Sequence, residues 1–307
     1  MQNKLFYTLN DVLRENFGTK IIKLSLDGGF TCPNRDGNCG SRGCIFCSPI
    51  GSGEFAGNRK ISIHEQMQSQ IELLRPKWPN AKYIAYFQNF TNTYASAEKL
   101  RAIYDEALAF DDVVGLAIAT RPDCLDEDVL NLLNEYKQKT FLWVELGLQS
   151  IHKKTADFIR RGYELPVFDE AMIALNRYQI PVVVHLILNF PGENLRDMED
   201  SLRYVCDAGV WGIKLQMLNV LRHTDLAFYF DKNPFYLRSA DEYIELISHL
   251  LTKIPPHIVI HRLTGDGNKK HLIAPRWVLN KRYVLNGIQR YMRAHNLYQG
   301  KFFDDIC

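Results

Sequence analysis

The amino-acid sequence predicts an α/β fold: a partial barrel of six βα units, (β/α)6, with a C-terminal extension. Six apolar, β-branched runs recur between residues 21 and 218, and stretches with helical periodicity separate them. The runs are almost continuously hydrophobic, which is typical of parallel strands buried on both faces. No repeat, low-complexity tract or clear Pro/Gly linker divides the 307 residues. We therefore expect a core at 1–222, including an N-terminal lead-in, and an extension at 223–307 packed on it.

The predicted strands are, in chain order, "IIKLSL" (21–26), "YIAYF" (83–87), "VVGLAIA" (113–119), "FLWVELGL" (141–148), "PVVVHLIL" (181–188) and "GIKLQML" (212–218). Between the third and the fourth, Val129, Leu132 and Tyr136 share the i, i+3, i+7 spacing of one helix face. Regular alternation of strand and helix favours parallel pairing through right-handed crossovers. Beyond the six units, a possible seventh strand is expected at 258–263 and a closing helix at 278–292.

Composition and charge narrow the class of protein. The sequence is 46% hydrophobic and 23% charged, as in ordinary globular proteins, and its formal net charge is only +2. Binding of nucleic acid would therefore depend on a local patch such as Lys269 and Lys270. The first twenty residues lack the apolar block of a signal peptide, and no run reaches the roughly 18 apolar residues of a membrane span. We expect a cytoplasmic protein that has no membrane partner.

Polar or glycine-containing segments follow the predicted strands. After the second to fifth strands they are "QNFTNTY" (88–94), "TRPD" (120–123), "QS" (149–150) and "NFPGE" (189–193). The C-terminal ends of the strands in a βα barrel share one face, so these segments are expected to surround one ligand site.

The segment after the first strand, "TCPNRDGNCGSRGCIFC" (31–47), holds four of the seven cysteines. Thiolates favour zinc or iron–sulfur centres, and the C-x2-C pair Cys44 and Cys47 can reach one centre from a tight turn. The spacing alone leaves zinc and iron–sulfur open, and it leaves Cys32 and Cys39 as competing third ligands. Three cysteines on a four-iron, four-sulfur cluster would keep one iron open for a substrate or cofactor. The isolated Cys124, Cys206 and Cys307 are expected to be ordinary thiols.

Three strings resemble the radical S-adenosylmethionine (SAM) enzymes related to the Elongator catalytic subunit and to oxygen-independent coproporphyrinogen oxidase. They are "CPNRDG" opening the C-x11-C-x2-C run, "VELGLQS" (144–150) followed by "RRGY" (160–163), and "HLILNFPGE" (185–193). The likeness covers roughly residues 20 to 220 and implies a radical SAM barrel. Its narrower part, "YTLNDVLRENFG" with "YFQNFTNTYA", resembles a bacterial branch of radical SAM proteins placed in modification of the wobble uridine of tRNA.

The resemblance implies a cofactor set and its ligands. Cys32, Cys44 and Cys47 would bind a 4Fe-4S cluster; Cys32 is preferred to Cys39 because "TCPN" carries the likeness. SAM would chelate the fourth iron, and an electron from a flavodoxin- or ferredoxin-type donor would cleave it to a 5′-deoxyadenosyl radical. Related members use a glutamine matched by Gln149 near the ribose and an arginine matched by Arg161 at the SAM carboxylate. The remaining expected SAM contacts are Phe46, Gln88, Asn89, Thr120 and Gly192.

This sequence departs from the family at two places besides the extra Cys39. Gln88 and Asn89 stand where the family has a glycine pair whose backbone meets the SAM amine. The chain also leaves no room for the acetyltransferase domain of Elongator, so acetyl transfer is not expected.

The resemblance further implies a substrate: a C5-substituted wobble uridine in tRNA, for example one whose carboxymethylaminomethyl group is remodelled before a partner methyltransferase acts. Basic residues interleaved with an aromatic side chain would suit binding of an anticodon loop. They lie in "RLTGDGNKKH" (262–271) and at Arg276, Trp277, Lys281 and Arg282.

Two other functions stay open at this point. A radical SAM enzyme of a porphyrin-like or other small molecule would need a closed, apolar pocket lined by residues such as Trp143 or Trp211. A zinc-stabilised binding module would need no radical chemistry.

Charged residues within the strands are the candidates for chemistry. Glu145 and Lys214 are the predicted catalytic residues, because a buried carboxylate needs a partner and Lys214 lies on the sixth strand at the expected substrate site. Further candidate substrate contacts are Gln216, His223 and Asp225, whereas His185 is expected to be a satisfied core residue.

Overall fold

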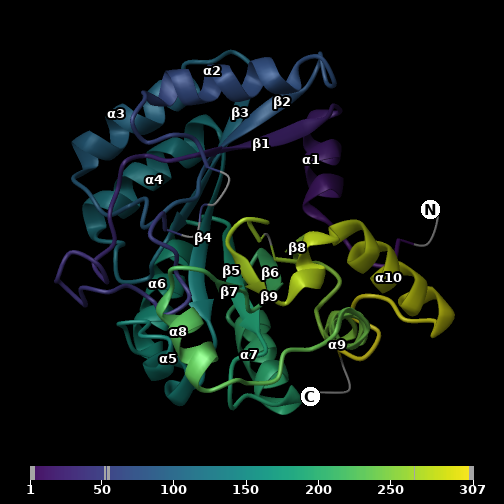
Figure 1. Ribbon diagram of the computed structural model, residues 1–307. Coiled ribbons are helices and arrows are strands. Elements are labelled where there is room, and N and C mark those ends of the chain that lie inside the picture. Colours follow the sequence, from purple (N-terminus) through teal and green to yellow (C-terminus); the bar gives the residue numbers. More distant parts are fainter. Residues whose placement is uncertain (1–3, 52, 54–55, 266, 304–307) are drawn as a thin grey trace.

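The structure, a computed structural model, describes residues 4–51, 53, 56–265 and 267–303. Within these ranges seven strands form one parallel sheet in the order β1-β2-β3-β4-β5-β6-β8, and the sheet curves into an open barrel wall (Figure 1). The strands are β1 (Ile21–Leu26), β2 (Lys82–Phe87), β3 (Val113–Thr120), β4 (Phe141–Gln149), β5 (Val182–Leu188), β6 (Gly212–Met217) and β8 (Val259–Arg262).

The predicted α/β partial barrel is confirmed, and each of the six predicted strands is present with its ends moved by at most one residue. The fifth strand, for instance, begins at Val182 because Pro181 has no N–H to donate to the ladder. The possible seventh strand is also real: β8 pairs with β6 in the same sheet. A strand from the expected extension thus completes the wall, and the boundary at 222 stays a prediction.

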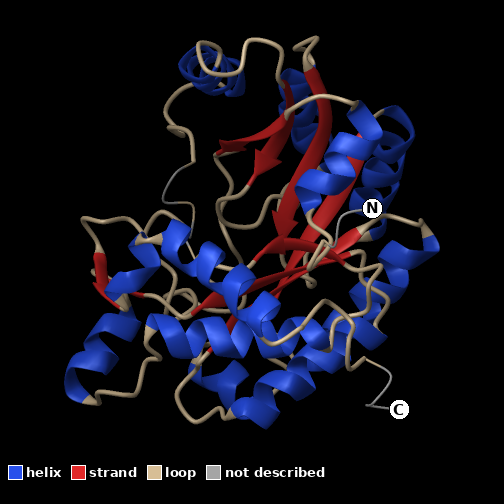
Figure 2. Ribbon diagram, turned by 90° about the vertical axis from the view of Figure 1, so that its right-hand side faces the viewer, coloured by secondary structure: helices blue, strands red, loops and turns tan. Residues whose placement is uncertain are grey.

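Most of the helices cover the outer side of the sheet (Figure 2), and α1 (Leu9–Phe17) lies inside the barrel. The other helices are α2 (Ile63–Leu74), α3 (Ala97–Leu108), α4 (Glu127–Lys139), α5 (Lys153–Phe158), α6 (Leu165–Arg177), α7 (Leu195–Asp207), α8 (Asp225–Lys232), α9 (Ala240–Thr252) and α10 (Lys281–Ala294). Side chains that satisfy the first backbone N–H groups start most of them; Asn194, for example, forms a capping box with Asp197 at α7. The closing helix begins at Lys281 rather than at 278, because a 3-10 turn at Arg276–Leu279 precedes its cap Asn280.

Alternation along the strands separates two apolar regions. On β2, Tyr83, Ala85 and Phe87 pack against the outer helices, whereas Ile84 and Tyr86 belong to the cluster inside the barrel. Leu9, Val12 and Leu13 of α1 join that inner cluster. Helix α1 therefore fills the barrel interior away from the C-terminal strand ends, which leaves those ends for the site.

A short antiparallel ribbon lies beside the C-terminal end of β6. It consists of β7 (Val220–Leu221) and β9 (Leu272–Ala274). Of the isolated cysteines, Cys124 and Cys206 are buried thiols, and Cys307 lies outside the described residues. None of the helices described is both long enough and apolar enough to cross a bilayer.

Candidate active site

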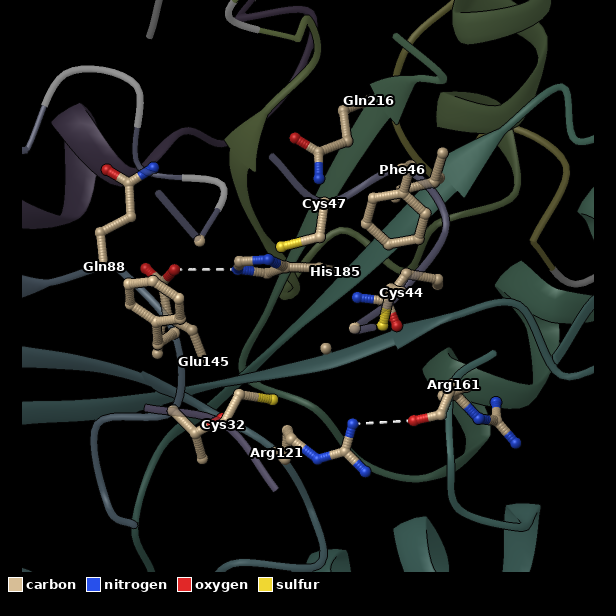
Figure 3. Close-up of a pocket in the computed structure, with 18 of the residues that line it drawn as sticks. Cys32, Cys44, Phe46, Cys47, Gln88, Arg121, Glu145, Arg161, His185 and Gln216 are labelled. Carbon is tan, nitrogen blue, oxygen red and sulfur yellow. Dashed lines mark hydrogen bonds and ion pairs between the residues drawn. The ribbon is translucent and has the colours of Figure 1, made fainter. Parts of the chain in front are cut away.

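A cavity of about 230 Å³ opens at the C-terminal ends of the strands. Side chains from every strand from β2 to β8 and from the cysteine loop reach it (Figure 3). The predicted site residues that line it are Cys32, Cys44, Phe46, Cys47, Gln88, Thr120, Glu145, Gln149, Arg161 and Lys214. Asn89 and Gly192 do not line it: the Asn89 amide donates instead to Asp27 Oδ2 at 2.8 Å. Their part in SAM binding stays a prediction.

The three cysteines that the resemblance implies as cluster ligands, Cys32, Cys44 and Cys47, line the same cavity, and we call them the cluster cysteines. Cys39 does not join them. It is exposed, its thiol lies 3.8 Å from Asp123 Oδ2, and it lines a separate surface pocket. This placement supports Cys32 over Cys39 as the third ligand.

The loop that carries the cluster cysteines is braced by its own chain. The Asn34 amide donates to Arg160 O at 2.5 Å and to Cys44 Sγ at 3.4 Å. The Arg35 guanidinium donates to Cys47 O and Ser48 O at 3.1 and 2.7 Å. Hydrogen bonds to ligand sulfurs are one means by which proteins tune iron–sulfur clusters.

Burial governs the protonation of the Cys44 thiol. Burial and then the neighbouring Cys47 raise the pKa of the Cys44 thiol to about 12, against a smaller opposing effect of Arg121. Without a cation the thiol would stay protonated at neutral pH, whereas bound iron stabilises a thiolate. The donor set of the loop, three thiols that line one cavity, fits an iron–sulfur cluster.

Arg161 is buried at the end of β4. Its Nη1 donates to Ser150 O and Leu148 O at 2.7 and 3.3 Å, and its Nε donates to Tyr163 O at 3.1 Å. These bonds fix the turn after β4 and engage two of the three guanidinium nitrogens, so among the described contacts Nη2 is the one left to meet a ligand carboxylate.

Arg121, which the sequence analysis did not select, also lines the cavity. Its guanidinium is held in a fork by Asp123 at 2.8 and 2.6 Å and donates to Arg161 O at 2.7 Å (Figure 3). The string "TRPD" was the available signal, because an arginine two residues before an aspartate can form such a fork.

Gln149 ends β4 in the left-handed region, with φ 67°. A non-glycine residue pays roughly 1–2 kcal/mol for this conformation, which is typical of functional sites. Gly147 gives it room: a Cβ at that position would lie 2.7 Å from Gln149 Nε2. The glycine of "ELGLQ" thus allows the glutamine side chain to lie along the cavity wall.

The "NFPGE" segment supports this turn from outside the cavity. Glu193 accepts hydrogen bonds from Ser150 Oγ at 2.5 Å and Thr155 Oγ1 at 2.6 Å, although burial still raises the pKa of its carboxyl. Gly192, with φ 88°, makes the turn that brings Glu193 back. Two of the three strings behind the resemblance are therefore in direct contact.

The inner end of the cavity is a charged network centred on Glu145, which has no exposed surface. The carboxylate accepts from Tyr86 Oη at 2.8 Å, His185 Nε2 at 2.9 Å (Figure 3) and Trp143 Nε1 at 3.0 Å, and it pairs with Lys214 Nζ. His185 is therefore a member of the network as well as part of the wall.

Further cations surround this carboxylate. Lys23 Nζ lies 4.0 Å from Glu145 Oε1, and Arg262 lines the same cavity. Burial alone would raise the pKa of the Glu145 carboxyl. Lys214, Lys23 and His185 nevertheless hold this pKa well below its usual value. Sequence reasoning missed Lys23 and Tyr86, and it assigned Arg262 only to a basic segment for RNA. The signal for Lys23 was a lysine inside the apolar first strand.

Comparison with known proteins identifies the family. A model of the radical SAM superfamily matches residues 36–205, and a model of the radical SAM C-terminal domain matches residues 210–294. The chain belongs to the radical SAM superfamily. It is an enzyme of that superfamily, whose members use a 4Fe-4S cluster and SAM and need an electron donor, so the zinc-module alternative is set aside.

Related sequences span nearly the whole chain. Uncharacterized protein YtqA of Bacillus subtilis is 44% identical over 99% of this chain and 94% of its own length. Protein YhcC of Escherichia coli is 34% identical over 96% of this chain and 94% of its own length. Elongator complex protein 3 of Mus musculus is 26% identical over 52% of this chain and 29% of its own length.

Among solved structures, archaeal Elp3 of Methanocaldococcus infernus superposes on 92% of this chain and 64% of its own, with a TM-score of 0.68 and 18% identity. SuiB of Streptococcus suis, bound to S-adenosylmethionine, covers 85% of this chain and 54% of its own, with a TM-score of 0.52 and 8% identity. At these identities the likeness shows the shared fold of the radical SAM core.

Proposed function

We propose that this radical SAM enzyme modifies the C5 side chain of the wobble uridine in tRNA. When bound, the cluster and SAM supply a 5′-deoxyadenosyl radical that takes a hydrogen atom from the substrate. The cluster cysteines would hold the cluster, while Gln149, Arg161 and Phe46 would position SAM beside it. A flavodoxin- or ferredoxin-type protein would deliver the electron, and a separate methyltransferase would act on the product.

The observation that carries this proposal is the polar, charged character of the inner cavity. Tyr86, His185, Lys214 and Gln216 line it together with Glu145, and such a wall suits the polar side chain of a modified base.

The small-molecule alternative, in contrast, called for an apolar pocket lined by Trp143 or Trp211. These two rings pack against each other at a tilt, with centroids 5.8 Å apart, and belong to the apolar cluster around α1 instead of the cavity wall. The apolar pocket that this alternative called for is therefore not formed by these two rings.

Basic residues beside the cavity support an RNA substrate. Leu221 lines the cavity, and the next residue, the exposed Arg222, is hydrogen-bonded through its backbone N–H to His271 O at 2.7 Å. Lys269 and Lys270, both exposed, immediately precede His271. This edge of the ribbon thus brings positive charge to the entrance, where phosphates of an anticodon arm would be attracted.

One expected contact is different in the structure. Trp277 is half-buried, packs against Tyr243 with ring centroids 4.9 Å apart, and donates to Arg238 O at 2.8 Å. It serves to join the 3-10 turn to α9, so base stacking on this ring is not part of the proposal.

The test compares tRNA from cells with and without the gene by nucleoside mass spectrometry, followed by anaerobic assay of the loaded enzyme with that tRNA. We expect an altered C5 side chain at the wobble uridine in the deletion strain and RNA-dependent formation of 5′-deoxyadenosine in vitro. Unchanged nucleosides together with no stimulation by tRNA would refute the proposal.

A paired variant tests the basic edge. Replacing Lys269 and Lys270 by alanine should weaken tRNA binding roughly tenfold or more at low salt and flatten its salt dependence. The matched control is Lys82→Ala, since Lys82 is exposed at the opposite end of the sheet, at the start of β2.

A further inference from the structure

Lys214 is a buried cation in the inner wall of the cavity with an available donor. Lys214 on β6 lines the cavity, and its side chain is only 2% exposed. Its ammonium has three N–H groups, and its hydrogen-bond partners in the described part of the chain are Glu145 Oε2 and Tyr86 Oη, the latter at 3.0 Å. One N–H therefore remains to meet a ligand in the cavity.

Glu145 itself has little capacity for a ligand. Its Oε2 accepts from Tyr86, His185 and Lys214, and its Oε1 accepts from Trp143. A carboxylate offers about four lone-pair positions, so this group is saturated by protein donors. It can orient Lys214, but it is poorly placed to take a proton from a substrate.

Positive charge also exceeds negative charge in this network. Lys23 and Lys214 share the one carboxylate of Glu145, and Arg262 adds a further cation at the cavity wall. Burial first, then the charges of Lys23 and Arg262, lower the pKa of Lys214 in opposition to Glu145. A second anion in the cavity would offset this repulsion.

The wall next to Lys214 is suited to the same group. Gln216 is two residues further along β6 and lines the cavity closer to its mouth. Arg262, on the neighbouring strand β8, also lines the cavity. An ammonium, a carboxamide and a guanidinium on adjacent strands form the kind of donor set that binds a planar carboxylate.

We propose that Lys214 binds a carboxylate carried by the C5 side chain of the substrate uridine, and that Glu145 is the positioning residue that orients Lys214. The inference rests on the proposed function and specifies its substrate class: an anionic C5 substituent. The depth of Lys214 favours a group at the end of a side chain over a phosphate of the folded RNA backbone.

The test uses the cluster-loaded enzyme and two anticodon stem-loop RNAs, one with 5-carboxymethylaminomethyluridine at the wobble position and one with the neutral carboxamide in place of its carboxylate. The readouts are the Kd of each RNA, and kcat and KM for 5′-deoxyadenosine formation. A hydrogen bond to a charged partner corresponds to roughly 10- to 100-fold in affinity. The wild-type enzyme should therefore prefer the carboxylate RNA by about that factor.

Lys214→Met should lose this preference, because it weakens binding of the carboxylate RNA much more than binding of the carboxamide RNA. Because this variant removes the ammonium that pairs with the buried Glu145, the double variant Lys214→Met/Glu145→Gln is measured beside it and should show the same loss. Glu145→Gln alone should keep the preference, since the ammonium remains, while kcat falls. Lys23→Met is the matched control, because Lys23 contacts the same carboxylate without lining the cavity.

Each outcome decides between the two proposals. RNA that neither binds nor stimulates the enzyme refutes the proposed function and this inference together. Equal binding of the two RNAs by the wild-type enzyme overturns the carboxylate assignment alone. A rise in the KM for SAM in the RNA-free reaction of Lys214→Met would assign the lysine to the SAM carboxylate instead. Loss of the preference in Glu145→Gln, together with its retention in Lys214→Met, would overturn the assignment of the carboxylate to Lys214.

Discussion

Replacing Glu145 by alanine is the most direct test of the network beneath the cavity. The carboxylate is fully buried and accepts hydrogen bonds from Tyr86, His185 and Trp143 besides its pair with Lys214. In the alanine variant Lys214 stays buried, with Tyr86 Oη at 3.0 Å as its described hydrogen-bond partner. Removal of one member of a buried ion pair costs about 3–5 kcal/mol in the free energy of unfolding.

The contacts of Glu145 bound the expected loss in the free energy of unfolding. Four hydrogen bonds to a charged group, at about 1.5–3 kcal/mol each, would sum to roughly 6–12 kcal/mol. Much of that sum is offset, because burying the carboxylate costs several kcal/mol in the native protein. We therefore expect a loss of about 3–5 kcal/mol for Glu145→Ala. That is a large fraction of the roughly 5–15 kcal/mol that stabilise an ordinary domain.

Urea denaturation followed by tryptophan fluorescence measures this loss. The comparison is the double variant Glu145→Gln/Lys214→Met, which removes both charges and keeps the side-chain volumes, and which should lie within about 1.5 kcal/mol of the wild type. A loss below about 1 kcal/mol in Glu145→Ala would refute the reasoning. So would a double variant as unstable as the sum of its two single variants, because that result would show no coupling between the charges.

Three further outcomes are expected. Alanine at any one of the cluster cysteines should abolish iron and sulfide binding and 5′-deoxyadenosine formation, whereas Cys39→Ala should retain both. Arg161→Ala should raise the KM for SAM and lower stability by about 2–3 kcal/mol in urea titrations, because it leaves buried carbonyls at the end of β4 without their donor; an unchanged unfolding midpoint would contradict this. Burial first, then Lys214 and Arg262, lower the pKa of His185 from 6.5 to about 4. Glu145 acts in the opposite direction. The folded protein thus binds this proton less readily than the unfolded chain, and the stability from His185 is complete above pH 6.5 and is lost as the pH falls towards 4. His185→Gln should lack that loss, so the wild-type advantage over the variant should shrink by roughly 3 kcal/mol across this window in urea titrations, and parallel pH profiles would contradict the assignment.

Local sequence signals were sufficient for much of this fold. The near-continuous apolar runs predicted β1 to β6 because a parallel strand buried on both faces tolerates few polar residues. The cysteine spacing together with the three strings predicted a common site, and the cluster cysteines do line one cavity.

What could not be predicted depends on contacts between strands. Lys23 and Glu145 lie on β1 and β4, far apart in the sequence, and their proximity follows from the curvature of the sheet. The roles of Arg161 and Trp277 likewise depend on carbonyls that only the folded chain brings near them. Their side-chain types marked these residues as candidates for a functional role. Their hydrogen-bond and ion-pair partners were seen only in the structure.

The bracing of the cysteine loop has a consequence for how the enzyme is made. Asn34 and Arg35 fasten the loop to Arg160, Cys47 and Ser48 through ordinary protein hydrogen bonds, none of which needs iron. We therefore expect the loop to take this conformation before the cluster is inserted. Purified protein should take up iron and sulfide anaerobically without passing through a denatured state. Maturation in the cell would then consist of inserting the cluster into a protein that is already folded.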